Sequence, residues 1–154
     1  MYTGTAEYSF SPMSPEHLSE YAELYSAAFS APPWNEPWTP EAAGKRIGAM
    51  MSASSFIGLA LYSAGSLKGF IFGQTEYHHS GAEFQIQEFC VAPDEQGRGY
   101  GSSLLGGLRR KLGEEGITGG IYLITSRTDA TAGWYACHGF REAQGFIVMN
   151  DSKE

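Results

Sequence analysis

The sequence has little cysteine and little positive charge, and each shortage excludes a class of protein. Its 154 residues include two cysteines, Cys90 and Cys137, each within an otherwise apolar segment. No second Cys or His lies at ligand spacing, so we expect two buried, reduced thiols and no disulfide or metal site. Lys and Arg total 10 against 17 Asp and Glu, which gives a net charge of −7. A general nucleic-acid binder needs a positive surface, so nucleic acid is not an expected partner.

Long apolar runs are also missing. No segment reaches the roughly 18 apolar residues of a membrane helix, and residues 1–10 lack a basic stretch followed by an apolar run. We therefore expect a soluble, cytoplasmic protein with no membrane partner. No repeat or long linker divides the chain, so residues 1–154 are predicted to form a single domain. The adjacent His78 and His79 would point to opposite faces of a strand, which favours a solvated loop first and an acceptor-site rim second.

The chain does have a clear succession of helix and strand patterns. Ser14-Pro15 and Thr39-Pro40 each place a capping residue before a proline, which is typical of a helix start. Alternating apolar residues around short turns predict strands and hairpins elsewhere. The order predicts an α+β fold with a mostly antiparallel sheet flanked by helices. The expected strands cover residues 5–10, 55–62, 67–77, 83–92 and 119–125, with one or two more within 140–149, and the expected helices cover 14–30, 39–51, 99–112 and 130–138.

An unusual loop joins the first two expected helices. Its sequence, Pro32-Pro33-Trp34-Asn35-Glu36-Pro37-Trp38, is rigid, bulky and polar at once. In one interpretation, a proline-stiffened connector lets its tryptophans fill the core. In the other, Trp34, Glu36 and Trp38 form one wall of a substrate cleft, because loops on rigid scaffolds often determine specificity.

The segment 87–102 carries the clearest chemical signal. A strand ends at Pro93, and Gly97-Arg98-Gly99-Tyr100-Gly101 then leads into a leucine-striped helix. A helix N-terminus offers unpaired N–H groups and a positive dipole end, and glycines let that backbone approach an anion. Neither the dinucleotide pattern GxGxxG nor the mononucleotide GK[ST] loop is present. The segment predicts a phosphate site of another kind, with a tight structural turn as the alternative.

Two motifs resemble the GCN5-related N-acetyltransferase (GNAT) family. Gln96-x-x-Gly99-x-Gly101 matches the family's [Q/R]-x-x-G-x-[G/A] loop, and the segment 134–140, WYACHGF, is similar to its FYxxxGF element. The resemblance spans residues 84–149, whereas the N-terminal half matches in element order alone. It implies a mixed sheet in which two central parallel strands, expected at 83–92 and 119–125, splay apart around the pantetheine arm of acetyl-CoA. It also implies a possible homodimer, with residues 140–149 as contact edges.

The resemblance further assigns the cofactor-binding positions. Backbone groups at the splay would bind pantetheine, and Thr128 stands where many relatives have an Asn that contacts it. Backbone amides of the glycine loop would bind the pyrophosphate, with Gln96 as the first motif residue. The implied positions are Phe89, Cys90, Val91, Gln96, Gly97, Arg98, Gly99, Gly101, Ser102 and Thr128.

For catalysis we expect Glu88 as the general base and Tyr135 as the general acid. Glu88 stands in an apolar-aromatic strand beside the implied splay, although it could be a solvated, salt-bridged strand residue. The histone-acetylating branch places its base three residues earlier, where this chain has Gln85, so that assignment does not transfer. The reserve carboxylates are Glu36, Glu76 and Glu83. Tyr135 matches the family tyrosine aimed at the thioester sulfur, although a core tyrosine is the plainer alternative.

The expected function is therefore transfer of an acetyl group from acetyl-CoA to a primary amine, on a small molecule or a peptide. Direct attack by the amine is expected, with a carboxylate or a water-relayed base. Three alternatives stay open: a non-catalytic acyl-CoA-binding module of the same fold, a structural domain whose glycine loop is only a turn, and acyl transfer through Cys90.

Overall fold

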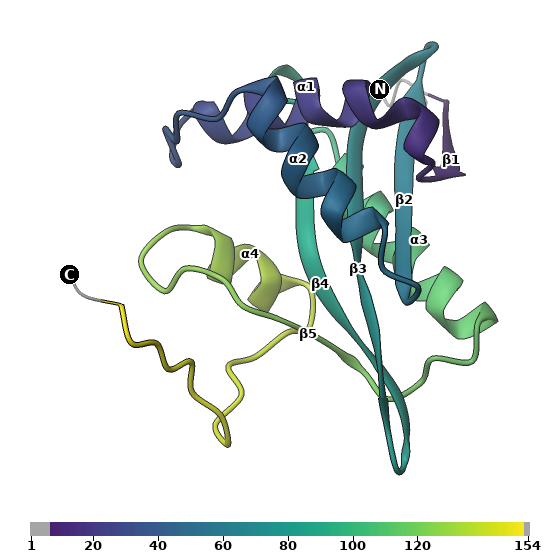
Figure 1. Ribbon diagram of the computed structural model, residues 1–154, viewed down its shortest axis with the longest axis vertical. Coiled ribbons are helices and arrows are strands. Elements are labelled where there is room, and N and C mark those ends of the chain that lie inside the picture. The colour runs from purple at the N-terminus through teal and green to yellow at the C-terminus, as the bar shows by residue number, and fades with distance from the viewer. Residues whose placement is uncertain (1–6, 153–154) are drawn as a thin grey trace, which may run out of the picture. The chain divides into compact units, whose positions relative to one another are not determined.

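Five strands form one mixed sheet in the computed structural model, which describes residues 7–152 (Figure 1). The strands β1 to β4 pair antiparallel in chain order, and β5 pairs parallel to β4. This confirms the mixed, mostly antiparallel sheet expected from the sequence. Residues 5–6 of the expected first strand lie outside the described residues. The strands are β1 (Tyr8–Pro12), β2 (Phe56–Ser63), β3 (Ser66–His78), β4 (Gly81–Val91) and β5 (Ile121–Leu123).

Two tight hairpins build the middle of the sheet. Between β2 and β3, Ala64 and Gly65 have φ angles of 51° and 78°, the two positive values of a type I′ turn. Between β3 and β4, His78 pairs with Gly81. The expected loop over 78–82 is therefore too long, because cross-strand pairing continues to the ends of both strands and leaves a two-residue turn.

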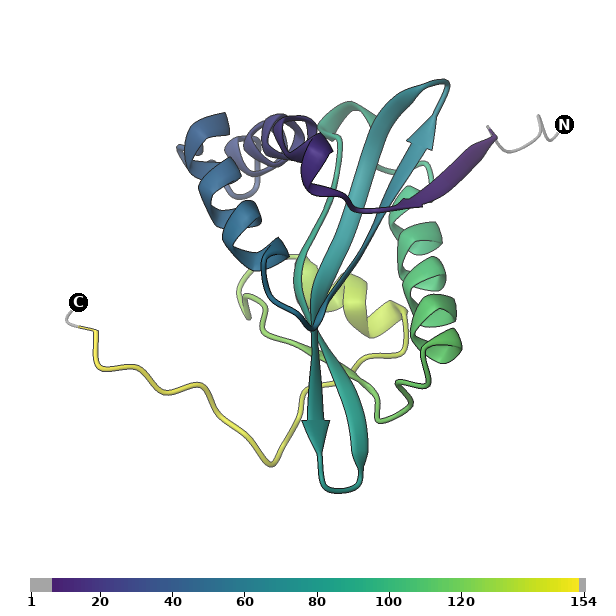
Figure 2. The same ribbon diagram turned by 45° about the vertical axis from the view of Figure 1, so that its right-hand side comes forward.

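Three helices cover the two faces of the sheet. A short 3-10 turn (Pro15–His17) leads into α1 (Leu18–Ser30), and α2 (Pro40–Met51) and α3 (Tyr100–Glu114) follow along the chain. The hydroxyl of Thr39 accepts a hydrogen bond from the backbone N–H of Ala42 at 3.1 Å, which confirms the predicted cap of α2. Helices α1 and α2 lie on one face and α3 on the other (Figures 1 and 2).

The largest side chains of the core lie between α1, α2 and the central strands. Tyr21 of α1, Ile47 of α2 and Phe70 and Phe72 of β3 are all buried. On the opposite face, α3 packs so closely on β1 that a Cβ at Gly107 would lie 2.8 Å from the ring of Phe10. Burial of these apolar surfaces holds the strand that carries the candidate site.

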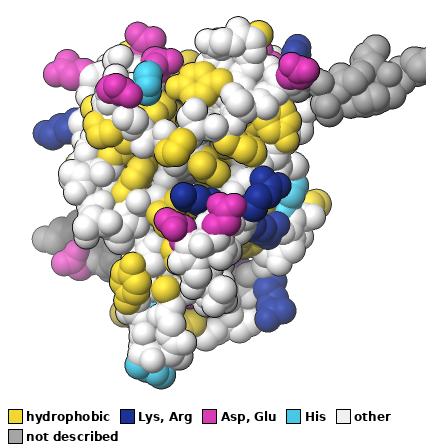
Figure 3. All heavy atoms as spheres, turned by 90° about the vertical axis from the view of Figure 1, so that its right-hand side faces the viewer, with side chains coloured by type: hydrophobic (Ala, Val, Ile, Leu, Met, Phe, Trp, Pro, Cys, Tyr) yellow, Lys and Arg dark blue, Asp and Glu magenta, His cyan; other side chains and the backbone are white. Residues whose placement is uncertain are grey.

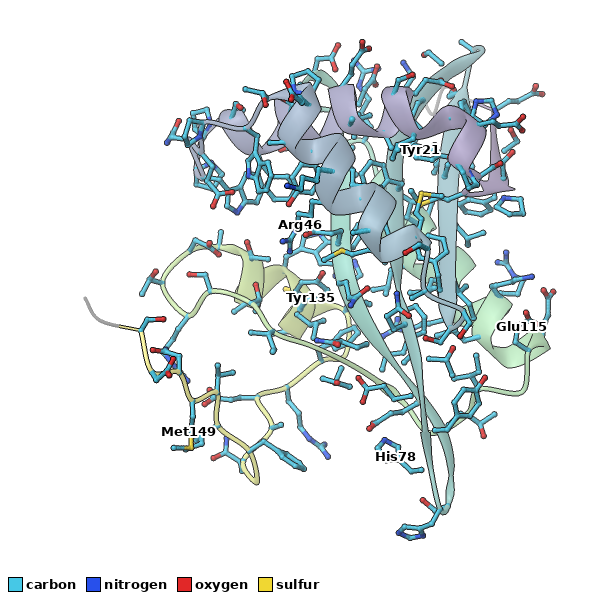
Figure 4. The ribbon with its side chains drawn as sticks, viewed as in Figure 1. Tyr21, Arg46, His78, Glu115, Tyr135 and Met149 are labelled. Atoms are coloured by element: carbon cyan, nitrogen blue, oxygen red, sulfur yellow. The ribbon has the colours of Figure 1, made fainter. Side chains whose placement is uncertain are left out.

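Residues 125–152 belong to a second, smaller compact unit. It contains α4 (Thr131–Cys137), which Gly139 terminates with a φ of 91°, as the sequence predicted. The expected strands within 140–149 are wrong: residues 140–152 adopt no strand, because they form no hydrogen-bond ladder with one another. The side chains of this segment that are large, apolar and exposed are Phe146, Ile147, Val148 and Met149, the last labelled in Figure 4.

The cysteine expectation is half right. Both thiols are free, and Cys90 is buried on β4. Cys137 is exposed, because it is the last residue of α4 and faces away from the buried Tyr135 side of that short helix.

The surface mixes charges of both signs. Basic and acidic side chains lie side by side on the face drawn in Figure 3. Such mixing also occurs in single ion pairs, for example that of Lys68 and Glu95 at 2.9 Å. Mixing of this kind weakens the long-range field on this face. Within residues 7–152, no helix has both the length and the hydropathy needed to cross a membrane.

Candidate active site

A β-bulge sets the direction of the Glu88 side chain. Phe72 of β3 pairs with Glu88, but the next residue, Gly73, pairs with Ile86, so Gln87 is an extra residue on β4. The bulge turns Glu88 to the face of Phe72, which is the face under α1 and α2. Gly73 permits this close approach, because a Cβ there would lie 1.8 Å from the carbonyl oxygen of Gln85.

Glu88 is a buried carboxylate with two hydrogen-bond donors on one oxygen. The Tyr25 hydroxyl donates to Oε1 at 3.1 Å, and Nε of Arg46 donates to the same oxygen at 2.6 Å. The Glu88 side chain is 9% exposed, whereas that of Arg46 is 43% exposed. Figure 4 shows Arg46 where α2 passes over β4. Both hydrogen bonds to Glu88 found among residues 7–152 end on Oε1, so Oε2 can accept a further hydrogen bond.

The three side chains of this trio shift one another's pKa values. Burial raises the pKa of Glu88 above its ordinary 4.5, and the hydrogen bonds from Arg46 and Tyr25 oppose that rise without cancelling it. Burial and the adjacent carboxylate raise the pKa of Tyr25, so the phenol stays protonated as a donor. Although burial lowers the pKa of Arg46, its contact with Glu88 more than offsets this and keeps the guanidinium charged.

An aromatic cluster lies next to this trio. We use that name for four rings: Tyr25 packs on Phe29 at 4.5 Å and on Trp38 at 5.0 Å, and Phe29 packs on Trp34 at 4.9 Å between ring centroids. The Trp38 indole N–H also donates to Glu36 Oε1 at 3.0 Å. The charge of Glu36 contributes to the raised pKa of Glu88.

The packing supports the core interpretation of the 32–38 loop, and its part in a substrate cleft stays a prediction. Trp34 and Trp38 are half-buried against α1, as a core function requires. Through Tyr25 they also border Glu88, so the structure brings the predicted acceptor residues to the predicted base.

Strands β4 and β5 pair over a short stretch. Their recorded partners are Phe84 with Ile121, Gln85 with Tyr122 and Ile86 with Leu123. Residues 87–91 continue β4 beyond this stretch, paired with β3. The predicted parallel pair is thus confirmed, and it ends just before Glu88.

The glycine loop has the backbone that an anion site needs. Gly97 and Gly99 have φ angles of 82° and 85°, and a Cβ built at either would meet no atom within 4 Å. Gly99 is the N-cap residue of α3, and Gly101 and Ser102 lie in its first turn. This open backbone at the N-terminus of a long helix fits a pyrophosphate.

Side chains around the loop fix its shape. Nε2 of Gln96 donates to the carbonyl oxygen of Val91 at 3.2 Å, which ties the loop to the end of β4. Arg98 lies 3.3 Å from Glu95, whose other oxygen accepts from Lys68. The contact with Lys68 lowers the pKa of Glu95. The Arg98 charge is therefore shared with a carboxylate in this structure.

Cys90 is unsuited to nucleophilic catalysis. Burial raises the pKa of its thiol well above the ordinary value, which keeps it protonated, and the thiolate is the reactive form. Its backbone and those of Phe89 and Val91 lie on the part of β4 beyond the pairing with β5.

The other two predicted positions, Thr128 and Tyr135, belong to the second unit. Tyr135 is buried in α4, with its ring 5.2 Å from that of Phe140 and 5.2 Å from that of Trp134. Thr128 precedes the helix, where its hydroxyl lies 3.1 Å from that of Ser126.

The reserve carboxylates Glu76 and Glu83 face each other across the β3–β4 hairpin. Tyr122 donates to Glu76, and Nε2 of His78 lies 2.7 Å from Glu83. Ligand atoms of Glu76, His78 and Glu83 lie within 4.8 Å of one another, the one such group found among the described residues. The cross-strand pairing of Glu76 with Glu83 and the contact of His78 with Glu83 account for that proximity.

The sequence prediction missed Tyr25 and Arg46. Tyr25 belongs to the apolar stripe of α1, where a tyrosine is easily taken as core. Arg46 follows the buried Ala43 by three positions, so it shares that residue's helix face. The available signal was indirect: a buried glutamate requires a cationic or hydrogen-bonding partner.

Comparison with solved structures finds the same fold in acetyltransferases. A possible acetyltransferase from Clostridium difficile 630 has a TM-score of 0.79 and 12% identity, over 96% of this chain and 99% of its own. An aminoglycoside acetyltransferase from an uncultured soil metagenomic sample has a TM-score of 0.72 and 18% identity, over 95% and 99%. The ribosomal-protein-alanine N-acetyltransferase of Brucella melitensis biovar Abortus 2308 has a TM-score of 0.70 and 16% identity, over 96% and 100%.

Sequence comparison identifies the family. Among curated proteins no match is found. Residues 54–142, more than half of the chain, match the family model of the acetyltransferase (GNAT) domain. The matched region contains β2 to β4, the bulge at Gln87 and the glycine loop. The chain therefore belongs to the GCN5-related N-acetyltransferase (GNAT) family of acetyltransferases.

Proposed function

We propose that this protein transfers an acetyl group from acetyl-CoA to a primary amine, by direct attack of the amine, with Glu88 as the general base. One observation carries the proposal: a buried carboxylate with a raised pKa stands immediately after the β4 bulge, bordered by the aromatic cluster. Bulges often re-aim a side chain beside an active site, and perturbed carboxylates concentrate at such sites.

The chemistry requires a proton acceptor. An alkylamine has a pKa of about 10.4, so on the order of one molecule in a thousand is neutral at pH 7. As the amine nitrogen bonds to the acetyl carbonyl carbon and the carbon–sulfur bond breaks, the nitrogen must lose a proton. Oε2 of Glu88 can accept that proton directly or through a water molecule, while Tyr25 and Arg46 hold the carboxylate through Oε1.

Acetyl-CoA supplies the acetyl group as an activated thioester. The open backbone of Gly97 and Gly99 at the start of α3 supports a pyrophosphate site, and Gly101 and Ser102 add N–H groups there. Phe89, Cys90 and Val91 would bind the pantetheine arm along the part of β4 beyond its pairing with β5. In the second unit, Thr128 would contact the same arm, and Tyr135 would donate a proton to the departing thiolate.

The proposal is tested by mixing the purified protein with acetyl-CoA and a panel of amines while free CoA is measured. Glu88→Gln should retain acetyl-CoA binding and lose most of the turnover. Glu23→Gln on the exposed side of α1 is the matched control, because it removes the same charge from a residue outside the site. Binding of CoA without acetylation of any amine would instead indicate a non-catalytic acyl-CoA-binding module.

A further inference from the structure

Arg46 has more hydrogen-bonding capacity than Glu88 uses. A guanidinium carries five N–H donors in a planar fork. Within residues 7–152, the guanidinium of Arg46 interacts with the neighbouring Tyr25 hydroxyl, and its Nε donates to Oε1 of Glu88 at 2.6 Å. This side-on contact leaves the edge formed by the two terminal amino groups, the edge that binds carboxylates with two parallel hydrogen bonds.

The position of Arg46 makes that edge accessible to an acceptor. Its side chain is 43% exposed, whereas Glu88 beneath it is 9% exposed. Because Arg46 Nε lies 2.6 Å from Glu88, an acceptor whose nitrogen reaches Glu88 also comes close to the guanidinium. Its charge is permanent, because the contact with Glu88 raises its already high pKa.

The charges around the base form a pattern with two signs. Glu88 and Glu36 are negative, and Glu36 is held by the indole of Trp38. Arg46 is positive and adjoins Glu88 directly. A cationic acceptor is attracted by Glu88 and Glu36 and repelled by Arg46, whereas an acceptor that also carries a neighbouring carboxylate can pair with Arg46 as well.

From this pattern we infer that the acceptor is an amine with a carboxylate on the adjacent carbon, as in a free α-amino acid, and that Arg46 binds this carboxylate. The inference rests on the proposed function, since it names the substrate class of the same site. The acceptor's nitrogen would face Glu88 Oε2, and its carboxylate would face the terminal amino groups of Arg46. The transfer forms the N–C bond of an N-acetyl amino acid, breaks the C–S bond and releases CoA as a thiol, which receives the proton that the amine loses.

Matched acceptors test the inference. For a small, an aliphatic and an aromatic side chain, the free amino acid, its carboxamide and the corresponding decarboxylated amine are each assayed for kcat/KM. The amine of the carboxamide is less basic than that of the free amino acid, so a larger share of it is neutral at a given pH. Without binding by Arg46, the carboxamide should therefore be acetylated faster than the free acid. We expect the free acid to exceed the amide and the decarboxylated amine by roughly tenfold or more, because it gains charge-assisted hydrogen bonds.

Variants of α2 assign the effect to one side chain. Arg46→Gln should reduce the acid-to-amide ratio to unity or below, because the amide is then favoured by its less basic amine. Arg46→Lys should retain part of the ratio, because the charge stays and the fork is lost. Lys45→Gln should leave the ratio unchanged, since it removes the neighbouring exposed charge of the same helix. Each variant is first checked for its melting temperature and for stabilisation by acetyl-CoA.

The outcomes separate this inference from the proposed function. If amides or decarboxylated amines are acetylated as well as the acids, the inference is wrong while the proposed function stands. A preference for acids that survives Arg46→Gln also overturns it. If no amine is acetylated, both fall. Should Arg46→Gln fail to fold, the ratio of the parent and its reduction in Arg46→Lys decide.

Discussion

Arg46 Nε lies 2.6 Å from Oε1 of Glu88, and this contact joins helix α2 to strand β4 just after the bulge. Glu88 is the one charged side chain in the buried class among residues 7–152. Removing Arg46 would leave the buried Glu88 charge uncompensated. The contact therefore affects how readily Glu88 binds a proton, and it is weak evidence for a net gain in folding stability.

The pH dependence of catalysis should follow this contact. A base works when deprotonated, so kcat/KM should rise through the pKa of Glu88, which burial places above 4.5. Arg46 and Tyr25 both stabilise the charged carboxylate and so lower that pKa. Arg46→Gln should therefore move the acid limb of the profile to higher pH, and Tyr25→Phe should move it the same way by less. A limb that stays in place in both variants would mean that another group titrates.

Gly73 should be indispensable to the bulge. A Cβ there would lie 1.8 Å from the backbone oxygen of Gln85, which forces β3 and β4 apart. Gly73→Ala should destabilise the protein by roughly 1–3 kcal/mol or more in chemical denaturation, the scale of an overpacked interior. Gly44→Ala on α2 is the control: its Cβ would meet Ala22 at an ordinary 3.7 Å, so stability should hold or rise. Equal stability of both variants would show that the bulge tolerates a side chain.

The glycine loop should be required for acetyl-CoA and dispensable for folding. Gly99→Val places a branched side chain at a φ of 85° in an exposed loop, where it obstructs the approach of a pyrophosphate. We expect a nearly unchanged far-UV spectrum and no rise in melting temperature with CoA. Gly106→Ala, in the interior of α3 with open space at its Cβ, should retain CoA stabilisation. Undiminished CoA binding by Gly99→Val would place the site elsewhere.

Tyr135→Phe removes a hydroxyl and little volume, so the ring contacts with Trp134 and Phe140 should hold. If Tyr135 is the acid, acetyl-CoA affinity should change little and kcat should fall by roughly 10²–10⁴-fold. Tyr122→Phe is a control, since that hydroxyl is engaged with Glu76 on the hairpin. Parent-like turnover of Tyr135→Phe would make Tyr135 a core residue of α4.

Much of the fold could be predicted because its signals are local. The cap at Thr39, the leucine stripe of α3 and the stop at Gly139 each depend on a few neighbouring residues. Glu88 is predicted as the base from its place in an apolar strand, beside the splay that the resemblance to the GNAT family implies. Ser14 shows the limit even of local signals: it begins a 3-10 turn, and its side chain makes no capping hydrogen bond.

What could not be predicted depends on tertiary contacts. Arg46 and Glu88 are separated by 42 positions in the chain, and their contact requires α2 to pack over β4. The bulge at Gln87 is a feature of the pairing between β3 and β4, and no pattern within β4 alone encodes it. Residues 146–149, FIVM, have an apolar, strand-forming composition, but a strand also needs a partner, and composition does not supply one.

The most direct test is to incubate acetyl-CoA with a free amino acid and measure N-acetylated product and free CoA together, for the parent and for Glu88→Gln. The account predicts equal amounts of the two products from the parent, and a loss of both by roughly 10²–10⁴-fold in Glu88→Gln, with acetyl-CoA binding retained. Free CoA without acetylated amine from the parent, or parent-like product formation by Glu88→Gln, would contradict it.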